Sequence, residues 1–376
     1  MTVRINLREL ADVTAPERAF LNVYLSSPRS ADALEKKLEK MRRVLRSAPE
    51  ARLDKPAVAQ VEKDEREYFD ANVAMVRKYL KKHPLETGSL AIFACWALDF
   101  FKAIPLTAPV EDLVWIDSSP YIRPLAELED EYENVAVVVA DNRKARVFLV
   151  SSAVASDAAV VAGNVKNHVK KGGWSQKRYE RRRDKQLLLY AREVVQALVK
   201  LDGEEAFRRI VLVGGKEILQ IIHAELPRAL RTKCSEKASD LKKGDARVQA
   251  DIWEVFAEQE RQSERDLWEK IRVEVMRGGL GVTGIEDVLD AARMGRVETV
   301  IVHRGLKPTG RRCRDCENLD AGPVEVCSAC GSTSLFEVDL VNELVEILKQ
   351  TGAEVDFADA IDTLTEAGGI AALLRY

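Results

Sequence analysis

Four of the six cysteines fall into two pairs with the spacing of metal ligands. The pairs, Cys313-Arg-Asp-Cys316 and Cys327-Ser-Ala-Cys330, are separated by ten residues. Each pair can present two sulfurs from one tight turn, and four sulfurs meet the tetrahedral preference of zinc. Because no His or carboxylate stands at a fifth position, the metal would be structural rather than catalytic. The sequence therefore predicts a zinc ribbon with four cysteine ligands at 308–335, with an empty or disulfide-paired loop as the alternative.

A basic segment around two adjacent glycines is the second candidate site. Between Lys166 and Lys185 there are nine basic residues and two acidic ones, in a chain whose net charge is -3. This local excess predicts contact with phosphate. Gly172 and Gly173 let the backbone approach a ligand closely, and Ser175 is expected to cap the helix that follows. The residues expected to bind RNA are Lys170, Lys171, Lys177, Arg178, Arg181, Arg182 and Arg183. The alternative is a solvated basic helix start.

Length and composition limit the classes of protein that fit. At about 150 residues per domain, 376 residues predict two or three domains. A hydrophobic content of 46% supports packed cores, and the balance of 58 basic and 61 acidic residues excludes a uniformly basic protein that coats nucleic acid. The N-terminal sequence fits neither a signal nor a transit peptide, and no apolar run reaches the length of a membrane span. We therefore expect a cytoplasmic protein without a membrane partner.

The sequence patterns around these two sites predict helices and strands that form an α/β fold with three α/β domains. A reduced N-terminal α/β domain is expected at 1–126, with a strand at Val23–Leu25 and a buried run at Leu90–Cys95. Between them, apolar residues at helical spacing predict two helices, the second ending at His83-Pro84. Short strands separated by proline turns are expected as far as about Pro124.

A middle domain is expected at 127–278, carrying the Gly-Gly loop and long helices. Its first part predicts a three-stranded meander at Val135–Ala140, Arg146–Val150 and Ala158–Val161. A long helix follows the basic segment, with an apolar stripe formed by Leu187, Ala191, Val194, Val195 and Leu198. A buried strand at Arg209–Val213 and a long charged helix at Arg247–Arg277 complete the domain.

A C-terminal α/β domain at 279–376 is expected to carry the ribbon as an insertion. Thr283 and Glu286 have the spacing of a capping box, and Gly295 predicts the left-handed end of that helix. A buried strand at Val300–Val302, a helix at Val338–Lys349 and a final strand-helix pair are expected to complete the fold.

The basic segment resembles the Gly-Gly-Gln-Ser-x-x-Arg-Phe-x-Arg segment of archaeal and eukaryotic class-1 peptide-chain release factors. The residues at matching positions are Gly172, Gly173, Ser175, Arg178, Tyr179 and Arg181. The stretches Ile285–Leu289 and Met294–Val302 resemble the start of that family's third domain, and Gly368–Tyr376 resembles its end. The resemblance covers roughly Tyr121–Tyr376 and identifies the chain as a divergent bacterial member of the release-factor and Pelota superfamily. The Asn-Ile-Lys-Ser stop-codon motif of the family is absent from the sequence.

The resemblance implies action at the ribosome. In the family, the Gly-Gly-Gln tip promotes attack of water on the ester of peptidyl-tRNA, so the implied catalytic residues are Gly172, Gly173, Trp174 and Gln176. Trp174 stands where the family has glutamine, and an indole has one donor and no acceptor with which to orient a water molecule. Hydrolysis could still use the Trp174 backbone N–H as an oxyanion donor, with Gln176 in the vacant role. Alternatively, Trp174 stacks on a base and holds the protein in place without chemistry.

Two main functions, with different partners, follow from these observations. The first is occupation of the ribosomal A site with hydrolysis of peptidyl-tRNA, in termination or ribosome rescue. The second is non-hydrolytic ribosome binding, as in hibernation or stall recognition. An RNA-binding protein that acts alone is a third. The expected partners are rRNA, the P-site tRNA and a translational GTPase bound through the C-terminal domain, and the expected state is a monomer.

Overall fold

The computed structural model divides the chain into two compact units. The first contains Met1–Asp130 and Glu264–Tyr376, and the second contains Glu131–Ser263. The residues described are 6–15, 17–46, 56–86, 88–106, 109–131, 135–151, 154–162, 174–204, 207–239 and 245–376. The first unit contains a main sheet from each of its two stretches, and a third, small sheet carries the cysteines. The architecture is therefore mixed α/β with several sheets, as the sequence predicts.

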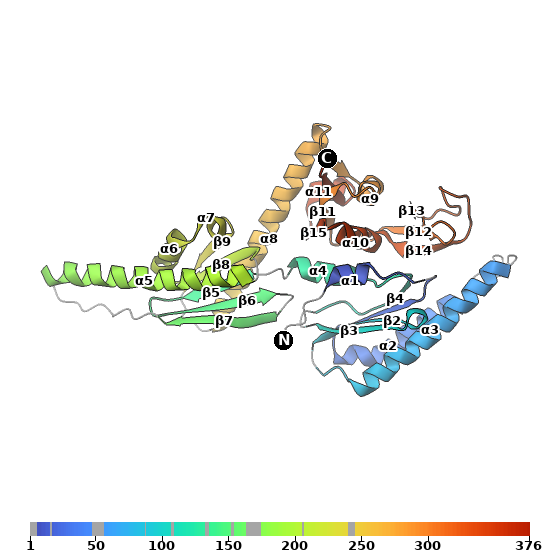
Figure 1. Cartoon of the computed structure of the whole chain (residues 1–376), viewed down its shortest axis with the longest axis horizontal. Coiled ribbons are helices and arrows are strands. Elements are labelled where there is room, and N and C mark those ends of the chain that lie inside the picture. The colour runs from blue at the N-terminus through green and yellow to red at the C-terminus, as the bar shows by residue number, and fades with distance from the viewer. Residues whose placement is uncertain are drawn as a thin grey trace. The chain divides into compact units, whose positions relative to one another are not determined.

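The N-terminal stretch forms a four-stranded antiparallel sheet in the order β3-β2-β1-β4 (Figure 1). Its strands are β1 (Phe20–Leu25), β2 (Ser89–Cys95), β3 (Phe100–Leu106) and β4 (Leu113–Asp117). Its helices are α1 (Leu7–Ala11), α2 (Pro28–Arg46), α3 (Pro56–Lys82), the 3-10 turn η2 (Trp96–Leu98) and α4 (Arg123–Glu131). Apolar residues of α2 and α3 pack on one face of the sheet, whereas α1 and α4 belong to the core shared with the C-terminal stretch. The two predicted helices and the predicted strand at Val23–Leu25 are confirmed, and the predicted buried run at Leu90–Cys95 forms β2, but α4 was not predicted.

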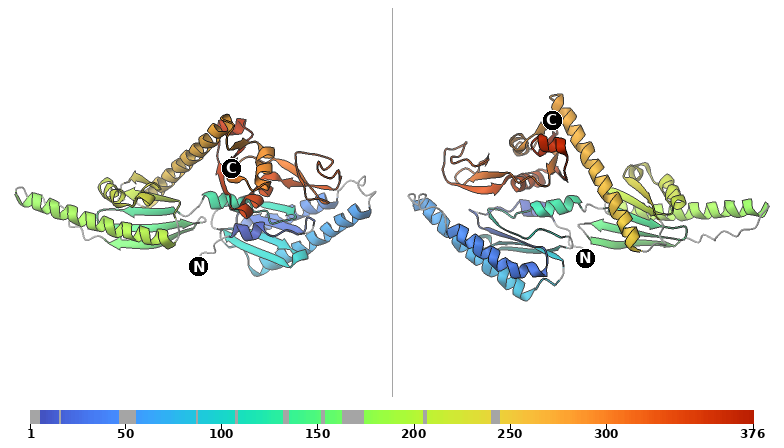
Figure 2. Two further views of the ribbon diagram at one scale, coloured as in Figure 1. Left: turned by 45° about the horizontal axis from the view of Figure 1, so that its top comes forward. Right: turned by 180° about the vertical axis from the view of Figure 1, so that it is seen from behind.

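The C-terminal stretch, drawn in orange to red in Figure 2, forms a mixed sheet. Its strands lie in the order β10-β16-β11-β15. Its strands are β10 (Gly281–Thr283), β11 (Val297–His303), β15 (Glu354–Ala358) and β16 (Ile370–Leu374), and its helices are α9 (Ile285–Arg293), α10 (Leu340–Thr351) and α11 (Asp362–Glu366). The β11-β15 pair is parallel, and β16 pairs antiparallel with β10 and β11. A separate small sheet, in the order β13-β12-β14, contains β12 (Thr309–Cys313), β13 (Leu319–Ala321) and β14 (Leu335–Asp339).

Three local predictions for this stretch are wrong. The predicted final strand-helix pair is followed by a further strand, β16, because Ile370–Leu374 pairs with β10 and β11. Thr283 lies in β10, paired with Ala371, and α9 begins after Gly284, so the predicted capping box does not form. Val338 belongs to strand β14 rather than to a helix, because Asp339 ends the strand and caps α10 through the backbone N–H groups of Val341 and Asn342. Gly295 does adopt a positive φ, of 67°, directly after α9, as expected of a left-handed helix end.

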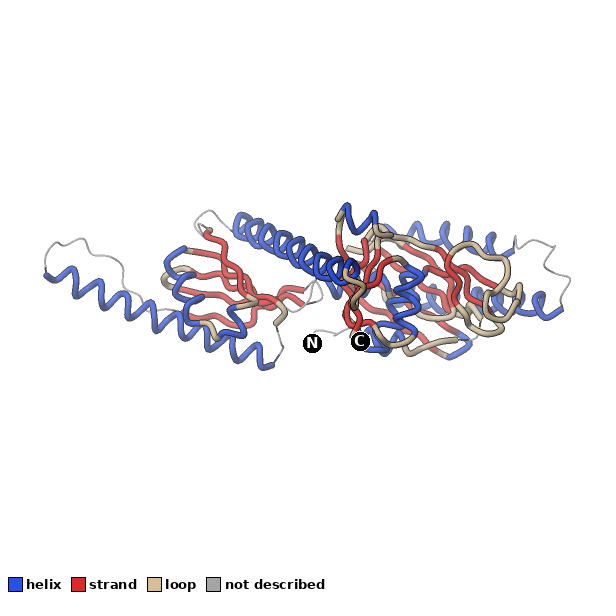
Figure 3. The backbone as a smooth tube through the Cα atoms, turned by 90° about the horizontal axis from the view of Figure 1, so that it is seen from above, coloured by secondary structure: helices blue, strands red, loops and turns tan. Residues whose placement is uncertain are grey.

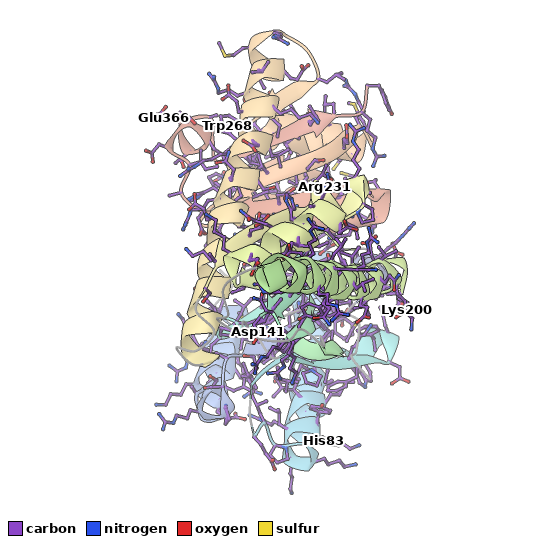
Figure 4. The ribbon with its side chains drawn as sticks, turned by 90° about the vertical axis from the view of Figure 1, so that its left-hand side faces the viewer. His83, Asp141, Lys200, Arg231, Trp268 and Glu366 are labelled. Carbon is purple, nitrogen blue, oxygen red and sulfur yellow. The ribbon has the colours of Figure 1, made fainter. Side chains whose placement is uncertain are left out.

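The long helix α8 (Asp245–Met276) ends in the first unit, where Trp268 packs on the C-terminal sheet. Trp268 is 5% exposed, and its indole N–H donates to the Thr363 hydroxyl at 2.7 Å. Figure 4 shows Trp268 on α8 and Glu366 at the end of α11, the helix that contains Thr363. Trp268 is thus a core residue of the first unit.

The second unit is built on a sheet whose strands are among those drawn in red in Figure 3. The sheet has five strands, in the order β7-β6-β5-β8-β9. Its strands are β5 (Val135–Ala140), β6 (Lys144–Ser151), β7 (Val154–Ala162), β8 (Arg209–Gly214) and β9 (Cys234–Ala238). The helices are α5 (Trp174–Glu204), α6 (Lys216–Glu225), α7 (Arg228–Arg231) and the first part of α8. The meander of β5, β6 and β7 is antiparallel, whereas β5, β8 and β9 are parallel. The predicted meander, buried strand and long helices are therefore confirmed.

Helix α5 is anchored to this sheet through its C-terminal part. The predicted apolar stripe from Leu187 to Leu198 is buried, together with Tyr190, in the main core of the unit. The N-terminal turns of α5 extend beyond the sheet (Figure 1). Within the described part of the chain, no helix has the length and apolar character needed to cross a membrane.

Candidate functional site

The four predicted metal ligands come together at the end of the small sheet. Cys313 ends β12, Cys316 follows in the next turn, and Cys327 and Cys330 lie on the connection between β13 and β14. We call residues 313–330 the cysteine loop. The sulfur atoms of the four cysteines all lie within 4.8 Å of one another, and none of the four thiols is in a disulfide bond. Cys313 and Cys327 are buried, whereas Cys316 and Cys330 are exposed.

The two Cys-x-x-Cys hairpins have the same backbone hydrogen bonds. In the first, Cys313 N–H donates to Asn318 O at 2.9 Å, and Glu317 N–H donates to Cys313 O at 2.9 Å. In the second, Cys327 N–H donates to Ser332 O at 2.8 Å, and Gly331 N–H donates to Cys327 O at 3.0 Å. In each hairpin the residue after the second cysteine has a positive φ, 59° at Glu317 and 75° at Gly331. Two equivalent turns thus hold two sulfurs each.

The sulfur separations fit a tetrahedral metal ion. Zinc–sulfur bonds of about 2.3 Å place two sulfurs of a tetrahedron about 3.8 Å apart. Across the hairpins, the Cys313 and Cys330 sulfurs are 3.5 Å apart, and those of Cys316 and Cys327 are 3.6 Å apart. These four residues can therefore hold a metal ion.

Asp320 joins the two hairpins from strand β13. Its carboxylate accepts the side-chain N–H of Asn318 at 3.0 Å and the backbone N–H of Ser328 at 3.2 Å, and it also accepts the Ser328 hydroxyl. Asn318 follows the first hairpin, and Ser328 lies inside the second. The arrangement of the cysteines is thus supported by neighbouring polar side chains.

The predicted basic loop is only partly described. Lys170, Lys171, Gly172 and Gly173 lie outside the described residues. Helix α5 begins at Trp174, so Ser175 is inside its first turn, and the prediction that Ser175 caps the helix is wrong. Gln176, Lys177 and Arg178 also belong to the first turns of α5. The backbone N–H groups of residues 174–176 thus stand at a helix N-terminus, where they have no partners within the helix.

The three predicted arginines farther along α5 differ in their surroundings. Arg181 and Arg182 are exposed. Arg183 instead forms an ion pair with Glu217 of α6, whose carboxylate also accepts the side-chain N–H of Asn142 at 3.2 Å. Arg181 and Arg182 are therefore available to an external phosphate, whereas the charge of Arg183 is already compensated.

A buried polar cluster in the first unit was not predicted. Asn342, Glu343 and Glu346 of α10 are at most 6% exposed. Glu343 pairs with Arg312, and Glu346 accepts the Ser119 hydroxyl at 2.8 Å and the Asn342 side-chain N–H at 2.6 Å. Burial raises the pKa of Glu346 to about 8, with Asp117 as the next cause. Polar residues at three- and four-residue spacing on an otherwise apolar helix were the signal for this cluster in the sequence.

Comparison with known proteins places the chain among translation factors. The family model for bacterial archaeo-eukaryotic release factor family 10 matches residues 120–261, and the model for eRF1 domain 3 matches residues 262–376. Peptide chain release factor subunit 1 of Methanocaldococcus jannaschii is 26% identical over 354 residues, covering 80% of this chain and 81% of the relative. A protein pelota homolog of Halorubrum lacusprofundi is 27% identical over 196 residues, covering 49% and 48%.

Solved structures of the same group are also similar to the chain. The crystal structure of the archaeal translation termination factor aRF1 shares 16% identity, covering 98% of this chain and 96% of that chain, with a TM-score of 0.26. The crystal structure of Archaeoglobus fulgidus Pelota shares 13% identity, covering 77% of this chain and 79% of that chain, with a TM-score of 0.33.

The two consecutive family models define a translation factor of the release-factor class. The chain belongs to the superfamily of archaeal and eukaryotic class-1 release factors and Pelota, in its bacterial branch. The predicted extent of the resemblance, from about Tyr121 to Tyr376, agrees with the residues that the two models match.

Proposed function

We propose that this protein occupies the ribosomal A site and promotes hydrolysis of the peptidyl-tRNA ester, in termination or ribosome rescue. The main support is the order of its parts. In the sequence, Gly172 and Gly173 directly precede the long basic helix α5, within a region that matches a release-factor model, and a match to a release-factor third domain follows. The named relatives are release factors and a pelota homolog. Binding beside the P-site tRNA, which the family resemblance implies, is therefore the simplest function for these parts. An activity at the ribosome also implies a cytoplasmic location.

The proposed chemistry uses the start of α5. Water attack on the ester creates negative charge on the carbonyl oxygen, and N–H groups at a helix N-terminus stabilise such charge. Trp174 begins α5 and supplies the first of these donors, next to Gly172 and Gly173. Gln176, in the same turn, is the amide that could orient the water.

A non-hydrolytic role is the second candidate, and the indole of Trp174 favours it. A tryptophan side chain cannot accept a proton from water, but it can stack on a nucleobase. In this case the protein would bind ribosomes in hibernation or stall recognition, without releasing the peptide.

Peptide release from ribosomes distinguishes the two functions. Ribosomes carrying labelled peptidyl-tRNA in the P site are incubated with the purified chain, and both released peptide and bound protein are measured. Hydrolysis predicts release that is lost in Gly173→Ala and Gln176→Ala and kept in Gln196→Ala, an exposed glutamine farther along α5. Stoichiometric binding without release would support the second function. Absence of binding at low salt would contradict both.

We also propose that Cys313, Cys316, Cys327 and Cys330 bind one structural Zn2+. The support is a set of four free thiols with separations close to those of a tetrahedral site. The ion would join the two hairpins and leave no position for a substrate. The metal content of protein purified without added metal tests this, with one zinc per chain expected.

A translational GTPase is the partner proposed for the C-terminal domain. The support is the match of residues 262–376 to eRF1 domain 3, whose family resemblance implies such a partner. Co-purification of a GTPase with the full chain, dependent on GTP, is the expected result. The chain is expected to act as a monomer.

A further inference from the structure

Arg314 connects the cysteine loop to the N-terminal stretch, residues Met1–Asp130. It lies inside the first hairpin, directly after Cys313. Its guanidinium pairs with Glu17 and, at 2.7 Å, with Glu65 of α3. The same guanidinium lies 4.9 Å from the centre of the Phe336 ring on β14. A residue held between two candidate metal ligands thus makes two ion pairs with a distant part of the sequence.

The ion pair between Arg314 and Glu65 is well shielded from solvent, whereas the Glu17 partner is partly exposed. Glu65 is 1% exposed and also accepts two hydrogen bonds from Arg18, at 2.7 and 3.1 Å. Burial alone would raise the pKa of Glu65, but Arg18 and Arg314 outweigh it, and the pKa lies below its ordinary value. Buried pairs of this kind are costly to break, because each partner is left as an uncompensated charge. The contact therefore strongly favours one position of the first hairpin against α3.

The position of Arg314 depends on the two hairpins staying together. Its backbone N–H donates to Ser334 O at 2.9 Å, on the chain that leaves the second hairpin. Two pairs of sulfurs are 3.5 and 3.6 Å apart, and as thiolates they would repel each other unless a cation lies between them. A metal ion bound by the four cysteines would therefore help to hold together the two hairpins that position Arg314.

A second arginine extends the contact along β12. Arg312, directly before Cys313, donates to the Ser118 hydroxyl at 2.8 Å and pairs with Glu343 of α10. Arg312 and Arg314 thus contact two separate parts of the N-terminal stretch, the end of β4 and helix α3.

We propose that metal binding by the cysteine loop and docking of the N-terminal stretch stabilise each other through Arg314. The inference depends on the metal site proposed above and adds a role for it, which is to hold two stretches of the first unit together. Coupling of this kind is reciprocal, so each event changes the other by the same factor. Typical coupling energies correspond to factors of about 5 to 150.

Metal affinity tests one direction of the coupling. The full chain competes for Zn2+ with a chromophoric chelator, as wild type, as Arg314→Ala and as Arg311→Ala. Arg311 lies on the same strand, and the described structure gives its side chain no ion pair with the N-terminal stretch. We expect Arg314→Ala to keep one zinc per chain but to weaken binding at least fivefold, with Arg311→Ala unchanged. Equal affinities for wild type and Arg314→Ala would overturn the proposal.

Hydrogen exchange tests the other direction. The backbone N–H groups of Ile122 and Arg123 donate to the Asn342 side chain, so their exchange reports docking directly. We expect removal of zinc, or Arg314→Ala with zinc bound, to speed exchange at these amides at least fivefold, while amides of β11 stay protected. Unchanged exchange at Ile122 and Arg123 would contradict the coupling. If the wild type binds no metal, the metal site itself is wrong and the coupling fails with it, whereas the peptide-release proposal still has its own assay.

Discussion

The side-chain oxygen of Asn342 accepts the backbone N–H of Ile122 at 2.8 Å, across 220 positions of sequence. It also accepts the N–H of Arg123, the first residue of α4, at 3.0 Å. These donors stand at a helix start, where no intrahelical partner exists. A residue of α10 thus supplies the capping interaction for α4, and the two stretches of the first unit depend on each other for hydrogen bonding.

Replacing Asn342 tests this capping interaction. Asn342→Ala leaves two buried N–H groups without an acceptor, at about 1–3 kcal/mol each. We expect a clear loss in the free energy of unfolding, measured by urea denaturation. Asn142→Ala, which removes an exposed amide that contacts Glu217, is the matched control and should change little. Equal effects of the two substitutions would contradict the assigned role.

The buried carboxyl groups predict a stability that falls as pH rises. The pKa of Glu346 is about 8 in the folded protein, and burial also raises the pKa values of Glu343 and Asp117. Between the ordinary glutamate pKa of about 4.3 and pH 8, the folded state keeps a proton that the unfolded chain has released. The stabilising effect of this proton is therefore fully present below the ordinary glutamate pKa and is lost as pH rises through 8. The free energy of unfolding falls by up to about 1.4 kcal/mol per pH unit in this range.

Glu346→Gln isolates this effect. Glutamine keeps an acceptor for Ser119 and Asn342 but carries no titrating proton. We expect the variant to be more stable than wild type at pH 8 and to have a flatter stability profile between pH 5 and 8. The exposed Glu354→Gln should follow the wild-type profile. A profile unchanged by Glu346→Gln would show that another group carries the pH dependence.

The arginines of α5 should contribute unequally to ribosome binding. Arg181 and Arg182 are exposed, whereas Arg183 is paired with Glu217. Affinity falls as salt concentration rises, and each lost phosphate contact makes the slope of log affinity against log salt concentration shallower by about 1. We therefore expect Arg181→Ala and Arg182→Ala each to reduce this slope, measured by co-sedimentation at several salt concentrations. Arg183→Ala should have a smaller effect, and equal slopes for all three variants would contradict the distinction.

Loss of one of the four cysteines should remove the proposed zinc ion and destabilise the small sheet. Cys316→Ser replaces an exposed thiol, so little packing is lost apart from the metal bond. We expect zinc content to fall from one per chain to well below that, with a lower melting temperature. Cys234→Ser, on β9 of the second unit, is the control and should keep its zinc. Full zinc retention in Cys316→Ser would argue against a four-cysteine site.

Local signals in the sequence predicted much of the fold and the grouping of the four cysteines. The apolar stripe of α5 and the meander of β5 to β7 follow directly from hydrophobic periodicity, and the cysteine spacing was sufficient to group four ligands. The errors came where tertiary contacts overrode local preference. Thr283 has the sequence of a helix cap, but pairing with Ala371 keeps it in a strand. Asn342 and Arg314 act on partners hundreds of residues away, and no local pattern identifies such partners.

The order of strands in the C-terminal sheet has a consequence for synthesis of the chain. β16 follows the other strands in sequence, yet it is an inner strand with β10 on one side and β11 on the other. Until Ile370–Leu374 has emerged from the ribosome, β10 and β11 have no common neighbour, and the sheet to which the N-terminal stretch docks is incomplete. The first unit can therefore reach its native state only once these residues are free, and a nascent chain cut short before β16 would lack the centre of this sheet rather than an edge.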